Sequence, residues 1–322
     1  MGAKVRAKNV SPLAIVIVNH HPILRSPMST PQFYPWQAYR CAYDRHAPTG
    51  TASGPPIVLI HPIGVGLSRQ FWQRFIAQWS QQSNSTVIYN PDLLGCGASS
   101  MPRAAYQPDD WGAQLEHFVK TVVKEPVVLV IQGALAPVAL ACVARFPELI
   151  RGMVWSGPPA WRLITTPTQP SQQKLAWNLF DTPAGAAFYR YARREQFLRS
   201  FSQRQLFGNP ADVDQEWLDE LHRGSRDLNS RHAVFAFLSG FWRQDYGEAI
   251  AAIPCPTLVL FGEGASSVTR GYREAAGDRL QAYLDHLPQG EGEIIPGRNV
   301  LPYESTAIFV DRVGKFIRNI TS

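Results

Sequence analysis

Three polar side chains of this sequence follow short apolar runs, where they could take part in nucleophilic catalysis: His61, Asp92 and Ser156. That chemistry needs a hydroxyl or thiol nucleophile, a histidine that takes its proton and an acid that orients the histidine. Cys96 adds a thiol in the turn after Asp92, although a buried structural thiol is the default for such a residue. Turn-forming roles are favoured over catalysis for Asp92 and over ligand binding for Ser156.

The elements that must position these residues can be predicted from the apolar pattern. Five continuous apolar runs indicate strands buried on both faces of a parallel sheet: 57–60, 87–90, 127–131, 153–155 and 257–261. Helical spacing of apolar residues predicts helices over 71–79, 111–123, 138–146 and 308–320. The alternation predicts an α/β fold with a mostly parallel, doubly wound sheet, in which ligands bind beyond the C-terminal strand ends.

The strand pattern stops over residues 161–250, which are helical in pattern and rich in aromatic residues and arginine. We therefore predict a core of residues 36–160 and 251–322, and a helical cap of residues 161–250 above the strand ends. Residues 1–35 are predicted to be a leader that is disordered, or an artefact of a translation start that lies at Met28.

Several sequence motifs stand in order along residues 36–320. Residues 61–66 follow the first of the five runs, residues 92–99 have the pattern D-x-x-G-x-G-x-S, and residues 128–157 form a strand–turn–helix–strand unit. Residues 253–262 and 295–304 add a strand and a later loop. Together these motifs resemble the α/β-hydrolase superfamily in its form with a helical cap. The resemblance implies that fold, and it suggests a cyanobacterial or plastid-type subgroup.

The resemblance also locates the three positions of a Ser-His-Asp triad. Gly133 takes the place of the nucleophile on the strand-to-helix turn, Ala265 that of the acid, and Val300 that of the histidine. None of these side chains can perform the triad chemistry. Loss of the nucleophile alone costs on the order of 10⁶ in turnover in a triad enzyme.

Other parts of the site are expected to remain. The resemblance implies that the backbone N–H groups of Ile63 and Ala134 would form the oxyanion hole, because Pro62 has no N–H to donate. A pocket with such donors and no nucleophile can bind a carbonyl or carboxylate without cleaving it. We expect six residues to line the pocket: His61, Gln132, Gly133, Trp155, Ser156 and Trp161.

Two functional hypotheses follow from these residues. The first is a non-hydrolytic protein, or pseudoenzyme, that binds a small apolar or carbonyl- or carboxylate-bearing ligand, or a protein partner through the cap. The alternative is an active hydrolase that acts on an ester or other acyl-type substrate through a non-standard site around His61, the best surviving base. In the family this histidine mostly holds the oxyanion loop, which favours the first hypothesis.

Within the predicted cap, residues 188–207 are rich in arginine and aromatic residues. Five arginines alternate there with aromatic residues, and on one helix Phe188, Tyr191, Leu198 and Phe201 would share a side. A solvated amphipathic helix is favoured. The alternative is peripheral contact with an anionic membrane, or an anionic ligand bound beneath the cap. Residues 233–242 are apolar on nearly all sides, which favours a helix buried between layers over a helix that forms a surface for a partner.

Composition excludes several classes of protein. The chain has 322 residues, of which 45% are hydrophobic, so wholesale disorder is excluded. The net charge is +6, but residues 1–27 carry +4 of it, which leaves +2 on residues 28–322 and little support for nucleic-acid binding. The four cysteines form no CxxC motif and the longest apolar runs are too short to span a bilayer. We expect a cytoplasmic protein without metal or cofactor.

Overall fold

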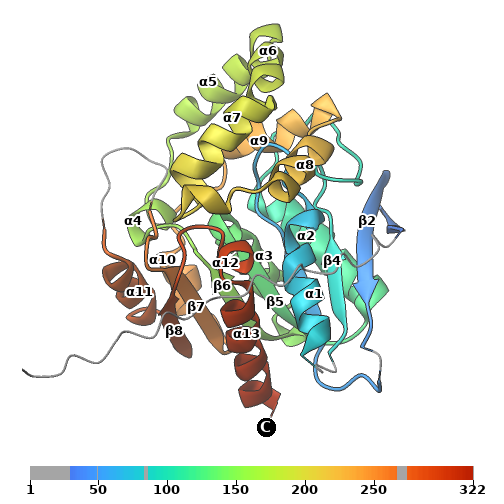
Figure 1. The fold of residues 1–322 in the computed structure, drawn as a ribbon, viewed down its shortest axis with the longest axis vertical. Coiled ribbons are helices and arrows are strands. Elements are labelled where there is room, and N and C mark those ends of the chain that lie inside the picture. Colours follow the sequence, from blue (N-terminus) through green and yellow to red (C-terminus); the bar gives the residue numbers. More distant parts are fainter. Residues whose placement is uncertain (1–29, 49, 83–85, 267–273, 322) are drawn as a thin grey trace, which may run out of the picture.

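The computed structural model describes residues 30–48, 50–82, 86–266 and 274–321 (Figure 1). Its sheet has the order β1-β2-β4-β3-β5-β6-β7-β8. The strands are β1 (Gln32–Trp36), β2 (Tyr39–His46), β3 (Ile57–Ile60), β4 (Ile88–Pro91), β5 (Val127–Gln132), β6 (Ile150–Ser156), β7 (Thr257–Gly262) and β8 (Gly290–Ile295). β2 runs antiparallel to β1 and β4, and the remaining neighbours are parallel. The predicted α/β class with a mostly parallel sheet is confirmed.

The five predicted strands correspond to β3 to β7, whose side chains are almost all buried. One boundary was wrong: residues 32–35 were assigned to the leader, but they pair with β2 as part of β1. In β1 exposed and buried side chains alternate, and Pro35 lies at the sheet edge. A search for continuous apolar runs therefore does not find this strand. The rest of the predicted leader, including Met28, lies outside the described residues.

Helices cover both faces of the sheet and separate two apolar cores. Alternate residues of β5 point to opposite faces, so that Leu129 joins one core and Val130 the other. The Val130 face is covered by α1 (Gln73–Gln81) and α13 (Thr306–Thr321), which pack on each other. The Leu129 face is covered by α2 (Pro108–Phe118), α3 (Ala136–Arg145) and α11 (Ala276–Leu284).

Between β6 and β7 the chain forms helices and no strand, as the sequence pattern predicts; all of these residues are described. The helices are α4 (Trp161–Ile164), α5 (Pro170–Phe180), α6 (Pro183–Ala192), α7 (Glu195–Phe201), α8 (Gln215–Gly224), α9 (Arg231–Leu238) and α10 (Gly247–Ala251). We call residues 161–250 the helical insertion. In Figure 1 its helices α5 to α9 gather at the end of the molecule opposite the C-terminus.

Short helical turns connect several of these elements. They are η1 (Arg69–Trp72), η2 (Val119–Val123), η3 (Gly133–Leu135), η4 (Pro147–Leu149), η5 (Ser202–Leu206), η6 (Pro210–Asp212), η7 (Leu228–Ser230) and the one-turn α12 (Leu301–Glu304).

Two expectations about the insertion need correction. The single helix expected to align Phe188 with Phe201 is two helices, because α6 ends at Ala192 and α7 begins at Glu195. Tyr191 is therefore exposed while Leu198 is buried. The apolar segment 233–242 contributes α9, whose residues 232–236 are buried, but Leu238 at its end is exposed.

Candidate functional site

The C-terminal ends of β5 and β6 lie side by side and share a buried polar contact. Gln132 and Ser156 are register partners, and the Ser156 hydroxyl donates to Gln132 Oε1 over 2.7 Å. Both side chains are buried. A buried hydroxyl and amide that pair with each other satisfy the hydrogen-bonding needs that burial creates. The structure thus brings these two predicted pocket residues together.

A third segment, the loop after β8, joins this contact. Gln132 Nε2 donates to the main-chain oxygen of Asn299 over 2.7 Å. The side chain of Asn299 in turn accepts a hydrogen bond from the Ser266 N–H (3.3 Å) and donates to its hydroxyl (3.4 Å). Gln132, Asn299 and Ser266 are the sequence neighbours of Gly133, Val300 and Ala265 respectively. The three positions that the family resemblance assigns to a triad therefore belong to adjoining loops.

Gly133 follows β5 directly and begins η3, which leads into α3. Its φ of +69° lies in the left-handed region that glycine adopts without strain. A Cβ built at this position would meet no atom within 4 Å. The backbone at the end of β5 thus forms a tight strand-to-helix turn, and the space where its side chain would project is open among the described residues.

Val300 and Ala265 occupy apolar surroundings. Val300 is buried in the core on the Val130 face, and Ala265 packs against the opposite core. The carboxylate of Glu304 holds the loop before α12, because it accepts from the N–H groups of Arg298 (2.9 Å) and Val300 (3.2 Å). Neither position offers a group that can transfer a proton.

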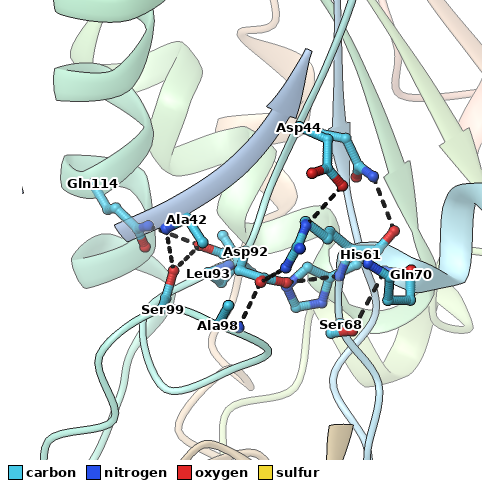
Figure 2. Close-up of polar contacts among 12 residues, drawn as sticks. Ala42, Asp44, His61, Ser68, Gln70, Asp92, Leu93, Ala98, Ser99 and Gln114 are labelled. Carbon is cyan, nitrogen blue, oxygen red and sulfur yellow. Dashed lines mark hydrogen bonds and ion pairs between the residues drawn. The ribbon is translucent and has the colours of Figure 1, made fainter. Parts of the chain in front are cut away.

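His61 is completely buried and both of its ring nitrogens are engaged (Figure 2). The Leu93 N–H donates to Nε2 over 3.1 Å, so Nε2 must be unprotonated. Nδ1 then carries the proton and donates to the Pro62 carbonyl over 2.9 Å. Burial, which disfavours the charged ring, lowers the pKa of His61. The neutral ring thus links the loop after β3 to the turn after β4 through its two hydrogen bonds.

Asp92 anchors that turn, as its predicted turn-forming role requires. Its carboxylate accepts from the Arg69 N–H (2.8 Å) and the Ala98 N–H (2.7 Å), and it pairs with the Arg69 guanidinium. Arg69 also pairs with Asp44 over 2.8 Å, and all three side chains are buried. Figure 2 shows Asp44 and Asp92 among the residues of this network. Arg69 and Asp44 were not predicted, because no local motif links residues so far apart in sequence.

Two predicted pocket residues, Trp155 and Trp161, pack on α11, and the Cys96 thiol is buried. Trp155 and Trp161 both contact the ring of Tyr283 on α11, edge to face, at 5.8 and 5.4 Å between centroids. Both rings therefore pack against α11. Burial raises the pKa of Cys96 far above that of a free thiol, so it stays protonated. Ile63 and Ala134, the expected oxyanion-hole residues, are both partly exposed.

The part of the chain that the structure describes contains no cluster of three or more His, Cys, Asp or Glu residues suited to a metal ion. Within the same residues, no helix has both the length and the apolar character needed to cross a membrane.

Comparisons with known proteins agree with this architecture. Over 136 residues, or 42% of the chain, the sequence is 32% identical to an uncharacterised protein of Mycobacterium tuberculosis, and the match spans only 37% of that relative's length. An esterase of Thermogutta terrifontis has a TM-score of 0.68 at 16% identity, with 91% of this chain and 100% of the esterase covered. An enol-lactonase of Burkholderia xenovorans has a TM-score of 0.67 at 14% identity, with coverage of 89% and 100%. Because the sequence profile of the alpha/beta hydrolase family also matches residues 57–312, the chain belongs to that family.

Proposed function

We propose that this chain is a non-hydrolytic member of the alpha/beta hydrolase family that binds a small carbonyl- or carboxylate-bearing ligand. The observation that carries the proposal is Gly133: it stands on the strand-to-helix turn with φ of +69° and has no side chain to attack a substrate. Because function depends on the groups at the site rather than on the fold, family membership does not restore the missing nucleophile.

Among the residues that the structure describes, neither Ser156 nor His61 can replace the missing nucleophile and base. The nearest hydroxyl by register is that of Ser156, which is buried and donates to Gln132. His61 has no lone pair free to take a proton, since Nε2 accepts from Leu93. A nucleophile with neither a base nor an acid to orient that base gives little rate enhancement.

The proposed ligand follows from what the turn still offers. Ala134 is the second residue of η3, and the first N–H groups of a helix lack intrahelical partners. Its N–H can therefore donate to a carbonyl or carboxylate oxygen in the open space beside Gly133, with Ile63 as the proposed second donor. The structural neighbours named above include an esterase and a lactonase, whose names denote substrates with an acyl carbonyl.

The first test measures catalysis. We expect the wild type to show no turnover of short acyl esters and no labelling by a serine-reactive fluorophosphonate. Gly133→Ser should stay inactive towards esters because it adds a hydroxyl without a base. The combined variant Gly133→Ser, Ala265→Asp, Val300→His should gain labelling if the three positions have triad geometry, and its fold should be checked by circular dichroism.

One outcome would establish the alternative function instead. If the wild type hydrolyses esters and His61→Ala abolishes this while His61→Gln, which keeps an acceptor for Leu93, also lacks activity and stays folded, the protein is a hydrolase that works through His61. For binding, a panel of small esters, lactones and carboxylates should give a saturable rise in melting temperature. Gly133→Ala, which places a methyl group in the open space, should reduce that rise.

A further inference from the structure

Helix α5 packs on two other helices of the insertion, α6 and α9. None of its 11 residues is buried, and Leu175 and Leu179, one turn apart, are 73% and 65% exposed. Trp177 and Phe180 occupy the other side of the helix, where they contact aromatic rings of the insertion such as Phe235. The two leucines therefore form an apolar stripe that faces away from the protein.

Helix α6 extends this stripe. Phe188 and Tyr191 are exposed, and the alanines at 184 and 187 on the same side of the helix are exposed as well. α6 packs on α5, and the rings of Phe188 and Phe180 are 6.4 Å apart between centroids. We call the exposed apolar residues Leu175, Leu179, Phe188 and Tyr191 the α5–α6 face. Figure 1 shows α5 and α6 at the tip of the molecule.

Cations lie on or next to α5 and α6, and the neighbouring acids are paired. Lys174, Arg190 and Arg194 are exposed and form no ion pair with any described residue. α5 and α6 contain no acidic residue, and the acids next to them in sequence are paired, Asp181 with Arg103 (2.7 Å) and Glu195 with Arg199 (2.9 Å). The helices of this face thus carry exposed apolar side chains and exposed cations that no described acid pairs with.

We propose that the α5–α6 face binds the surface of a membrane that contains anionic lipids, with α5 and α6 lying in the plane of the interface. Apolar stripes bordered by Lys and Arg are the features by which helices enter that region. A second copy on the same face would bring like charges together, so charge complementarity disfavours self-association. This inference is independent of the proposed ligand at Gly133.

The test is co-sedimentation of the full chain with vesicles of phosphatidylcholine alone and with vesicles in which part of it is replaced by phosphatidylglycerol. We expect binding to the anionic vesicles, weaker binding at high salt, and little binding to phosphatidylcholine alone. Leu175→Ser with Leu179→Ser should lower the partition coefficient at least about tenfold. Arg190→Gln with Arg194→Gln should lower it by about 10- to 30-fold.

Matched controls come from exposed residues elsewhere. Ile308→Ser removes an exposed apolar side chain from α13, and Arg151→Gln removes an exposed cation at the start of β6; both should leave vesicle binding unchanged. Equal binding to neutral and anionic vesicles, or binding that the leucine variant retains, would overturn the proposal. So would a stable dimer in sedimentation equilibrium that the leucine variant abolishes, because the face would then be an interface between copies.

Discussion

The side-chain amide of Gln132 donates a hydrogen bond to the main-chain oxygen of Asn299, with 2.7 Å between the two atoms. The two residues are 167 positions apart in sequence, and their contact connects the end of β5 to the loop after β8. Gln132 Oε1 simultaneously accepts from Ser156, so one amide links three loops. The strand ends around Gly133 are thus held by a polar network whose members hold one another rather than a substrate.

Replacement of Gln132 by alanine should destabilise the fold by about 1–3 kcal/mol. The variant leaves the buried Ser156 hydroxyl and the Asn299 carbonyl without their partner, and unpaired buried polar groups cost that much. Urea denaturation measures the change in the free energy of unfolding. The control Gln196→Ala removes an exposed glutamine from α7 and should change it by less than about 0.5 kcal/mol. Equal effects of the two substitutions would contradict a structural role for Gln132.

Two glycines with positive φ should respond differently to alanine. Gly133 has φ of +69° and open space around its missing Cβ, whereas Gly97 has φ of +58° and its Cβ would lie 2.2 Å from the Asp92 carboxylate. Both variants bear the backbone strain of about 1–3 kcal/mol, but only Gly97→Ala must also displace a buried, hydrogen-bonded carboxylate. We expect a clearly lower melting temperature for Gly97→Ala. A larger loss for Gly133→Ala would mean that the space beside Gly133 is filled.

Arg69 should matter far more than Arg103, although both pair with carboxylates. Arg69→Met leaves Asp44 and Asp92 buried without a counter-charge, which costs about 3–5 kcal/mol. Arg103→Met breaks an exposed pair with Asp181, where solvent screens the charges, and should change stability little. Guanidinium denaturation measures the free energy of unfolding of both variants. If Arg69→Met proved as mild as Arg103→Met, water would reach the two carboxylates in the folded protein.

Most of the sheet could be predicted because its central strands are buried on both faces. The five continuous apolar runs correspond to β3 to β7, and helical spacing located α1, α2, α3 and α13 within a few residues. β8 was missed because its sequence, Gly290–Ile295, holds two glycines and two glutamates, and an edge strand needs no continuous apolar run. β1 was missed for the same physical reason, since it is the other edge strand. β2 lies inside the sheet but holds charged residues such as Arg40, Asp44 and Arg45, so it also lacks a continuous apolar run.

Less of the candidate site could be predicted from the sequence. Local motifs located the tight turn at Gly133 and the loops after β7 and β8, because each is encoded within a few residues. The partners of these loops could not be found that way, since Gln132 and Asn299 meet only once the sheet is assembled. The ring contact of Trp155 with Tyr283 on α11 likewise forms only in the folded chain, because the two residues are far apart in sequence.

The free energy of unfolding should depend on pH in part because His61 is buried and its pKa is lowered. Its pKa is lowered in the folded protein, whereas a histidine in the unfolded chain titrates near about 6.5. Below that pH the histidine of the unfolded chain is protonated, while His61 in the folded protein stays neutral. The free energy of unfolding therefore falls as the pH falls. His61→Gln removes this linkage and should reduce the slope of unfolding free energy against pH by up to about 1.4 kcal/mol per unit.

The measurement is urea denaturation at intervals between pH 5 and pH 8. Some slope should remain in His61→Gln, because burial also lowers the pKa values of His46 and His232. Gln132→Ala serves as the matched control: it lowers stability at every pH but removes no titrating group, so its slope should equal that of the wild type. An unchanged slope in His61→Gln would show that His61 binds its proton equally well in both states. That result would leave its ring free to act as a base and would favour hydrolysis through His61 over the non-hydrolytic function.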